Sequence, residues 1–409
     1  MSYRAPPFAA TALAVDAPPI PACRAWAERY DGCHGPVLDL TQAVPGDRQP
    51  EELMDRLAAA AGDRALAGYG PLEGEPELRE AFAAETQRLH DGDVTPADVR
   101  VTAGANLAFS LAMAVLAAPG DSVLLPAPWF FNHQMALALR GVQAIPLPCT
   151  AAGAFLPDPE RAEALLTPRT RAIVLVTPNN PTGAILPLGL IAQFAELCRR
   201  RGLWLVLDET YRDFLPFGHM PHRLFSRPDW RDFVVQLYSF SKAYGVPGHR
   251  MGAVVAGGGF HAQFVKAVDN IQICPPRPPQ RALAWAIPML REWRDASRDR
   301  IQSRALAVQH ALRRAPAWEV DAQGAYFVWL RVPSGGPDAR IVAERLAREA
   351  GLVTLPGSVF GPGGERHLRV AFANVEERLL PAIPARLAAM LGRHGPASSG
   401  RAGLPAGGA

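Results

Sequence analysis

The sequence predicts an α/β protein, in which a large three-layer domain with a mostly parallel sheet precedes a smaller α+β domain. The first observation is that amphipathic stretches alternate with short apolar runs from about residue 51 to residue 258. Such runs are typical of parallel strands buried on both faces, and the amphipathic stretches predict the helices that cover them. The predicted strands are 99–102, 122–125, 172–176, 203–207, 233–237 and 253–256.

The second observation is a change of character after the proline-rich stretch 274–279. Long helical segments and two strands, at 325–332 and 367–372, then predict the smaller domain. Two helices of the large domain are expected at 107–117 and 188–201, the second ending at Gly202. We therefore expect an N-terminal arm, a large domain, a small domain and a disordered tail rich in Gly, Ala, Ser and Pro. Their predicted ranges are 1–45, 46–283, 284–394 and 395–409.

The composition favours a small-molecule partner. The chain has 409 residues, 49% of them apolar, and a formal net charge of only +3, without a block of like charges that would follow a nucleic acid or an anionic membrane. Its five cysteines are scattered and never form a CxxC pair, so we expect neither disulfides nor a metal site. With no leader-like segment in residues 1–10 and no long apolar stretch, a cytoplasmic location is expected.

A lysine follows the apolar run 233–237. Lys242 lies in the segment 239–250, together with Ser239, Ser241 and Arg250. Burial at the end of a strand lowers the pKa of a lysine toward that of a nucleophilic amine, which can form an imine with an aldehyde. The two hydroxyls and the guanidinium would bind a phosphate beside it. Taken alone, such a lysine is also typical of a surface turn.

An acid ends the run 203–207, and a tyrosine follows three residues later. Asp208 at the carboxyl end of a buried strand can keep a pyridine nitrogen protonated, so that the ring withdraws electrons from a carbanion. Tyr211 could then hydrogen-bond a phenolic oxygen of the same ring. An acid in this position is equally typical of a helix cap.

Two further segments follow buried runs. Asn180, within the segment 177–183, can donate a hydrogen bond to a ring oxygen or a substrate carboxylate, although the composition alone indicates only a turn. Gly104, Ala105 and Asn106 stand where a strand runs into a helix, and the free amides of a helix N-terminus favour a phosphate. An ordinary helix start is the alternative.

Together these segments resemble a known family. Their order and approximate spacing are those of class I/II aminotransferases, which are pyridoxal-phosphate enzymes of the aspartate aminotransferase fold, fold type I. The motifs that carry the resemblance are Asn180-Pro181-Thr182-Gly183, Asp208-Glu209-Thr210-Tyr211 and Ser239-Phe240-Ser241-Lys242 with Arg250. The resemblance spans roughly residues 38–391.

The resemblance implies further roles for aromatic residues and a histidine. Tyr69 looks like the tyrosine that reaches the cofactor phosphate of the neighbouring subunit, which implies a homodimer with shared active sites. Phe130 resembles the residue stacked on the pyridine ring, with Trp129 as the competing choice. His133 resembles the histidine that hydrogen-bonds Asp208 from behind.

The resemblance also implies how a substrate is held. Arg369 resembles the arginine that grips the α-carboxylate in a bidentate fork, assisted by Asn180. The segment 39–45 resembles the one that closes over the substrate, although the family usually has glycine where Ala43 stands. A cis peptide bond is implied between Asn180 and Pro181.

The implied activity is transfer of an amino group from an amino acid to a 2-keto acid, through a Schiff base on Lys242 and a 1,3-proton shift. Lyases, synthases and oxidases of the same fold are the alternatives, because they begin with the same carbanion. Dicarboxylate-specific members of the family bring a second arginine from the neighbouring subunit, but Asn270 to Gln272 stand at about that place here, and Arg277 nearby sits in a proline run. The aromatic stretch 129–131 therefore favours an apolar or aromatic amino donor.

Overall fold

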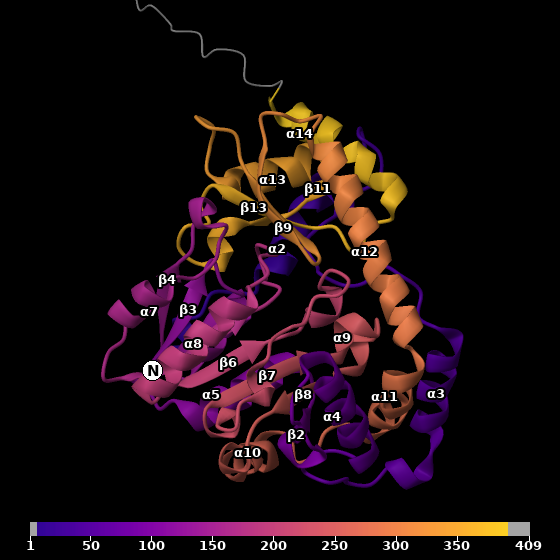
Figure 1. The fold of residues 1–409 in the computed structure, drawn as a ribbon. Coiled ribbons are helices and arrows are strands. Elements are labelled where there is room, and N and C mark those ends of the chain that lie inside the picture. Colours follow the sequence, from indigo (N-terminus) through magenta and orange to yellow (C-terminus); the bar gives the residue numbers. More distant parts are fainter. Residues whose placement is uncertain (1–5, 392–409) are drawn as a thin grey trace, which may run out of the picture.

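The computed structural model describes residues 6–391 and shows a large part and a smaller part joined by one long helix. In Figure 1 the large part lies at the bottom, and α12 (Arg291–Leu312) rises along its side to the small part. The expected tail at 395–409 and the end of the expected small domain, 392–394, lie outside the described residues. The domain boundaries given above stay predictions.

A seven-stranded sheet forms the centre of the large part. Its order is β2-β8-β7-β6-β5-β3-β4, and all neighbouring strands are parallel except for β8, which runs antiparallel to both of its neighbours. The mixed, mostly parallel sheet confirms the predicted fold class. The strands are β2 (Val99–Thr102), β3 (Ser122–Ala127), β4 (Gln143–Pro148), β5 (Thr170–Val176), β6 (Trp204–Asp208), β7 (Val234–Ser239) and β8 (Gly252–Val255).

The sequence analysis missed β4. This strand contains Pro146 and Pro148, which have no N–H to give to a neighbouring strand. β4 lies at the edge of the sheet and pairs with β3 alone, so these prolines leave no gap in a central ladder. Only the tertiary structure shows that these residues form a strand at the edge of the sheet.

Helices cover both faces of this sheet, which gives the predicted three layers. Along β5, Ile173 and Leu175 pack into one core while Ala172 and Val174 pack into the other, as the alternation of side chains in a strand requires. The first core is closed by α3 (Glu51–Gly62), α4 (Pro76–His90), α8 (Leu188–Arg201) and α11 (Arg277–Met289). The second core is closed by α5 (Ala105–Leu116), α6 (Phe131–Leu139) and α10 (Gly258–Ile271).

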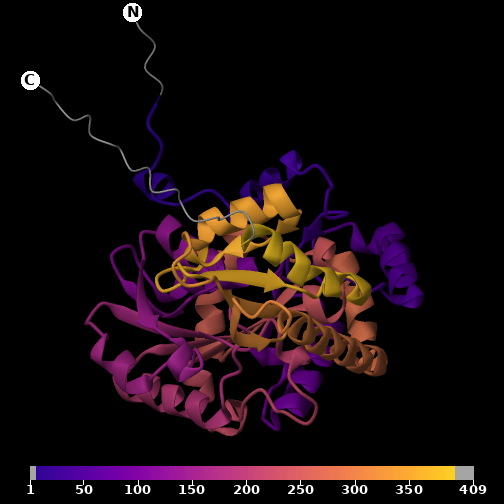
Figure 2. The same ribbon diagram turned by 90° about the horizontal axis from the view of Figure 1, so that it is seen from above.

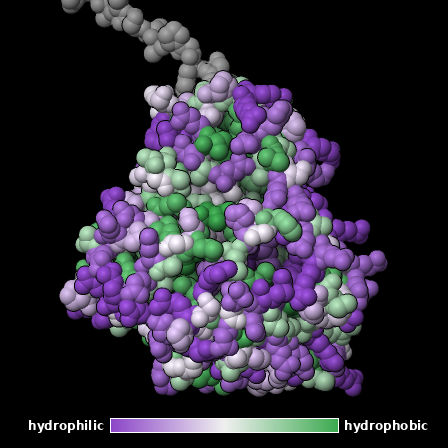
Figure 3. All heavy atoms as spheres, in the orientation of Figure 1, coloured by the Kyte–Doolittle hydropathy of each residue, from purple (hydrophilic) through white to green (hydrophobic). Residues whose placement is uncertain are grey.

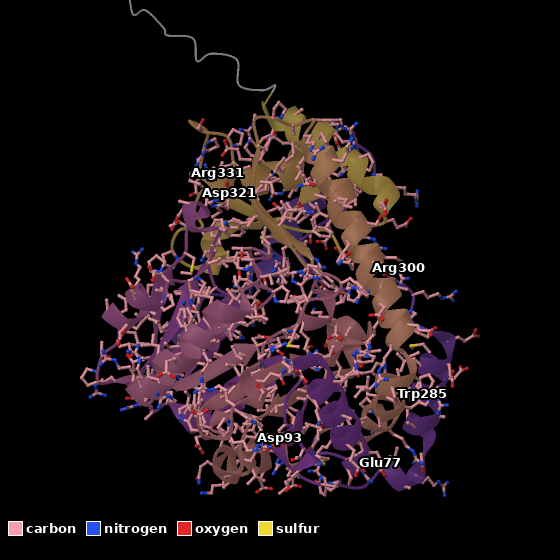
Figure 4. The ribbon with its side chains drawn as sticks, in the orientation of Figure 1. Glu77, Asp93, Trp285, Arg300, Asp321 and Arg331 are labelled. Carbon is pink, nitrogen blue, oxygen red and sulfur yellow. The ribbon has the colours of Figure 1, made fainter. Side chains whose placement is uncertain are left out.

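The small part is a four-stranded antiparallel sheet of order β12-β13-β10-β9 with helices beside it. Its strands and helices are β9 (Glu319–Gly324), β10 (Phe327–Arg331), β12 (Leu355–Pro356), β13 (His367–Ala371), α13 (Ala339–Ala350) and α14 (Ile383–Leu391). The strand β9 was missed because it is polar and lies at an edge. There Arg331 reaches across from β10 to Asp321, 2.7 Å away, and both are labelled in Figure 4.

The N-terminal arm lies against the small part. It contains α1 (Ala10–Leu13), α2 (Pro19–Trp26) and β1 (Leu38–Asp39), which pairs in parallel with β11 (Leu352–Val353). Figure 2 shows the arm beside the small part when the molecule is seen from above. Just after the arm, Asp47 pairs with Arg304 at 2.6 Å, so the segment that leaves the arm is held by α12. The remaining short helices are α7 (Pro159–Ala164) and α9 (Phe240–Ala243).

Apolar side chains gather on the middle of the face seen in Figure 3, at the level where the two parts meet. Polar side chains surround them above and below. Among the described residues, no helix is both long enough and apolar enough to cross a bilayer.

Candidate active site

A cavity of about 260 Å³ opens where the carboxyl ends of the central strands meet. Four parallel strands, β3, β5, β6 and β7, send their following loops to this edge, which is where open α/β sheets bind ligands. The small part and the arm close the other side. The lining residues are Ile20, Gln42, Ala43, Val44, Ala105, Asn106, Phe130, Phe131, Asn132, Val176, Asn180, Asp208, Thr210, Tyr211, Ser239, Ser241, Lys242, Pro247, Arg250 and Arg369.

Lys242 projects into this cavity from α9, directly after β7. Its Nζ donates a hydrogen bond to the carbonyl of Ala43 in the arm. Burial, together with the positive charges of Arg369 and Arg250, lowers the pKa of Lys242 to about 8. The sequence has only one other lysine, Lys266, which is exposed on α10. Lys242 is therefore the one lysine amine at the site, and a sizeable fraction of it is neutral near pH 8.

Asp208 ends β6 with its carboxylate in the cavity wall. His133 Nε2 lies 3.1 Å from Asp208 Oδ2, and the backbone N–H of Thr210 donates to Oδ1 at 2.9 Å. Burial alone would raise the pKa of Asp208, but the hydrogen bonds from His133 and Thr210 hold it below its ordinary value. The carboxyl group is thus kept ionised, and His133 occupies the position behind it that the sequence suggested.

Arg369 and Asn180 meet across the two parts of the molecule. Arg369 Nη1 donates to Asn180 Oδ1 at 2.9 Å, and Nη2 donates to the carbonyl of Thr41. Arg369 Nε is buried without a hydrogen-bond partner, and burial lowers the pKa of this guanidinium to about 10. A buried cation with an unused donor is a ready partner for an anionic ligand group. The peptide bond between Asn180 and Pro181 is cis, as expected.

The start of α5 forms a phosphate-sized cradle together with Arg250. Gly104 caps the helix at φ 95°, a backbone conformation that favours glycine, and Arg250 Nη2 lies 2.3 Å from where a Cβ would stand. Ala105 and Asn106 follow in the first turn of the helix and line the cavity. Ser239 and Ser241 line it from the end of β7, so five of the six predicted phosphate-site residues line the cavity and Gly104 shapes its wall.

The aromatic candidates occupy different places. Phe130 lines the cavity with its ring edge-on to His133 at 5.2 Å between centroids, whereas Trp129 lines a separate cavity beside Gly361. The structure therefore brings Phe130, and not its competitor, to the site. Tyr211 is buried against Phe327 of the small part, and this burial raises the pKa of its phenol.

Tyr69 is the one predicted site residue that lies far from the cavity. Its side chain is 81% exposed on the segment between α3 and α4 and does not line the site of its own chain. The contact of Tyr69 with the cofactor phosphate of a neighbouring subunit stays a prediction.

Several cavity residues were not assigned an individual role in advance, although Gln42 and Val44 lie in the predicted closing segment 39–45. Ile20 of α2, Gln42, Val44 and Asn132 all line the site. Ile20 depends on the arm folding back over the cavity, which local sequence does not encode. Gln42 is held by Arg24, whose Nη2 donates to it at 2.9 Å, and its neighbour Ala43 was the only residue of this segment singled out in advance.

Arg277 is engaged within its own chain. Its Nε donates to Glu75 Oε1 at 2.5 Å, and Nη1 donates to the carbonyl of Ala65 at 2.9 Å. These contacts fix the loop that carries Tyr69. A guanidinium committed in this way is not free to select the side chain of a substrate, in agreement with the little weight that its proline-rich surroundings gave it.

Comparison with known proteins gives one consistent result. The family described as aminotransferase class I and II matches residues 36–387. An aromatic aminotransferase of Arabidopsis thaliana is 32% identical over 86% of this chain and 88% of its own length. An aspartate/prephenate aminotransferase of Thermus thermophilus is 30% identical, with coverages of 87% and 91%.

Solved structures agree. The aspartate aminotransferase of Thermus thermophilus with maleate superposes with a TM-score of 0.85 at 25% identity, covering 94% of this chain and 99% of the other. An aromatic aminotransferase of Pyrococcus horikoshii has a TM-score of 0.82 at 26% identity, with coverages of 87% and 96%.

The fold and the cavity at its strand ends thus define an enzyme of the fold that aspartate aminotransferases share, and the chain belongs to the class I and II aminotransferase family. It is a pyridoxal-phosphate-dependent aminotransferase. The sequence-based prediction of fold, family and reaction is confirmed.

Proposed function

We propose that this aminotransferase moves the amino group of an apolar or aromatic amino acid to a 2-keto acid, in a homodimer whose subunits complete each other's sites. The proposed class of amino donor rests on the number of cationic side chains that line the cavity. Among the described residues, its lining contains three cations, Lys242, Arg250 and Arg369. Each has a place in holding the cofactor or the α-carboxylate, so this subunit leaves none for a second carboxylate. Arg277, the nearby candidate for such a role from the neighbouring subunit, is engaged within its own chain.

The residues present fit pyridoxal phosphate. The glycine-dependent cradle at Gly104, with the amides that open α5 and the guanidinium of Arg250, suits a phosphate dianion. Ionised Asp208 suits a protonated pyridine nitrogen, Phe130 suits a ring face, and Tyr211 and Asn180 suit the ring oxygen. When bound through Lys242, the cofactor supplies an electron sink for the amino acid's α-carbon.

The protein's own groups would orient the substrate and move its proton. Arg369 and Asn180 would hold the α-carboxylate, because both residues line the cavity, they are joined by a hydrogen bond, and Nε of Arg369 has no partner. Once released by the incoming amine, Lys242 would take up the α-proton and return it. A pKa of about 8 suits both directions of this transfer near neutral pH.

The arm would exclude water during these steps. The carbonyl of Ala43 accepts a hydrogen bond from Lys242, and the carbonyl of Thr41 accepts one from Arg369. The segment 39–45 therefore contacts both the proposed proton carrier, Lys242, and the proposed carboxylate ligand, Arg369. Gln42 and Ile20 add a polar and an apolar surface to the same wall. We therefore propose that the arm closes over the substrate. We also propose that Tyr69 contacts the cofactor phosphate bound in the neighbouring subunit.

A donor screen tests the donor class. The holoenzyme is mixed with single amino acids, and amino transfer is followed by the visible absorption of the cofactor and by keto-acid formation. We expect phenylalanine, tryptophan, methionine or leucine to exceed aspartate and glutamate by at least about tenfold in kcat/KM. Activity with aspartate or glutamate alone would overturn the donor class, and absence of transfer with every donor would overturn the proposed function.

A further inference from the structure

Directly behind Asp208, on the face of the sheet covered by α4, lies a closed cluster of polar groups that the reaction does not use. Glu209 is fully buried and follows Asp208 in the chain. His90 at the end of α4 places Nε2 at 2.9 Å from Glu209 Oε2, and His222 places Nε2 at 3.2 Å from Oε1. Gln236 of β7 donates to Oε2, and Arg212 Nη1 lies 3.7 Å from it.

The hydrogen bonds of His222 determine where its proton lies. The backbone N–H of Leu224 donates to His222 Nδ1 at 3.1 Å, so Nδ1 carries no proton. A neutral imidazole with a free Nδ1 carries its proton on Nε2, which faces Glu209. Burial lowers the pKa of His222 to about 3 and so keeps this ring neutral.

The hydrogen bonds of His90 give a different result. Nδ1 lies 2.9 Å from the carbonyl oxygen of Thr86, which can only accept, so Nδ1 must carry a proton. Nε2 faces a carboxylate oxygen, and this contact also needs a proton. Gln236 donates to the same oxygen, Oε2, whereas Oε1 lies 3.2 Å from His222 Nε2 without forming a hydrogen bond. Burial would raise the pKa of Glu209, but the neighbouring charges hold it below its ordinary value. Both contacts of His90 are satisfied when each of its ring nitrogens carries a proton and Glu209 is ionised.

The same protonation pattern argues against a metal ion. In the part of the chain that the structure describes, these three residues are the only group of His, Cys, Asp and Glu whose ligand atoms lie within 4.8 Å of one another. A metal would need the lone pair of His222 Nε2, but Leu224 leaves a proton there. The guanidinium of Arg212, stacked over Tyr238 at 4.2 Å, would also repel a dication.

We propose that His90, as a buried imidazolium, together with Glu209 and His222 forms a positioning unit that fixes the carboxyl end of β6 and thereby Asp208. The unit ties this strand end to α4, to β7 and to the loop at 222–224, through contacts on one side chain. Asp208 shares a peptide bond with Glu209, so a shift of Glu209 would displace the carboxylate in the cavity. This role rests on the function proposed above, whereas the protonation of His90 does not.

Nuclear magnetic resonance of the holoenzyme with ¹⁵N-labelled histidine tests the protonation of His90. Its ring protons are identified by their contact with Thr86, whose carbonyl oxygen lies 2.9 Å from Nδ1, because the ring of Phe225 lies near both His90 and His222. We expect both ring nitrogens of His90 to carry protons at pH 8, where an ordinary histidine is neutral, and His222 to carry one proton, on Nε2. A neutral His90 at pH 8 overturns the proposal, as does one equivalent of tightly bound metal in the purified protein.

A matched pair of variants tests the positioning role. Glu209→Gln removes the charge beside Asp208, and Glu85→Gln removes an equally buried carboxylate of α4 that pairs with Arg294 at 2.7 Å. For Glu209→Gln we expect kcat to fall by about tenfold or more with KM within about twofold, together with a shifted visible absorption of the bound cofactor. For Glu85→Gln we expect a comparable loss of thermal stability with kcat and absorption nearly unchanged.

If Glu209→Gln and Glu85→Gln change kcat and the cofactor absorption equally, the cluster around Glu209 has only a structural role, and the proposal is overturned. If Glu209→Gln does not fold, Gln236→Leu removes one donor to the same carboxylate, and a shifted cofactor absorption is again the expected result. The wild-type resonance measurement needs no variant. Failure of the proposed function would appear in the donor screen and would leave the histidine resonances unaffected.

Discussion

Asp208 and Glu209 are neighbouring buried carboxylates with histidine partners, yet the two sides of the strand end on which they lie are built differently. On the cavity side, Asp208 has one histidine at 3.1 Å and one backbone donor at 2.9 Å, and its remaining surface faces ligand space. On the closed side, Glu209 is surrounded by His90, His222, Gln236 and Arg212.

The difference shows how one pairing of side chains can serve two purposes. A carboxylate whose hydrogen-bonding capacity is only partly used can stabilise a charge brought by a ligand. A carboxylate that is fully buried and contacts only protein groups, as Glu209 does, is committed to holding the backbone, although only its Oε2 forms hydrogen bonds. Successive side chains at the end of β6 point to opposite faces of the sheet. Asp208 therefore faces the cavity and can meet a ligand, whereas Glu209 faces the closed side and holds the backbone.

The largest effect expected on the cavity side is that of Lys242→Ala. Without this amine the cofactor has no covalent anchor and the α-proton has no base, so turnover should fall by about 10⁴-fold or more. Borohydride reduction followed by peptide mapping should label Lys242 in the wild type and no lysine in the variant. Lys266→Ala, at the only other lysine, should leave turnover and labelling as in the wild type. Full activity of Lys242→Ala would contradict the assigned role.

Asp208→Asn should have the next largest effect. The amide keeps the shape of the carboxylate but brings no charge to the pyridine nitrogen, so kcat should fall by roughly 10³-fold while the cofactor still binds. Stopped-flow kinetics and cofactor content measure the two quantities separately. Asp232→Asn, at an exposed position of the same part, serves as control. A loss no greater than that of Glu209→Gln would remove the distinction between the two sides.

The smallest effect concerns the closed side and is a dependence of stability on pH. His222 has a pKa of about 3 in the folded protein against an ordinary value near 6.5. Between these values the unfolded chain binds a proton that the folded chain excludes, so the free energy of unfolding falls as the pH is lowered from 6.5. The loss should reach about 2 kcal/mol at pH 5.

His222→Asn preserves an acceptor for the N–H of Leu224 but does not titrate. Thermal unfolding should therefore depend less on pH between 6.5 and 5 in this variant than in the wild type, whatever its absolute stability. His310→Asn, at an exposed position of α12, should leave the slope unchanged. Parallel curves for wild type and His222→Asn would show that this ring is not held neutral.

The strands and motifs that local sequence encodes were predicted well. The apolar run that became β7 and the residues after it placed Lys242 at a strand end, and the same reasoning placed Asp208 and Asn180. The edge strands β4 and β9 were missed, because proline and polar residues are tolerated where one side of a strand is unpaired. The reversed direction of β8 was not visible either, since strand direction depends on pairing with distant segments.

The sequence by itself determined which residue types stand at the ends of the central strands, because hydrophobic runs and the polar residues that end them are local features. The tertiary structure decided which of those residues share a space. Glu209 and His90 are 119 positions apart, and Arg369 and Thr41 are 328 apart. Contacts over such separations form only when helices and sheets pack. The open cavity beside Asp208 and the closed cluster around Glu209 could therefore not be deduced from residues that are close together in the sequence.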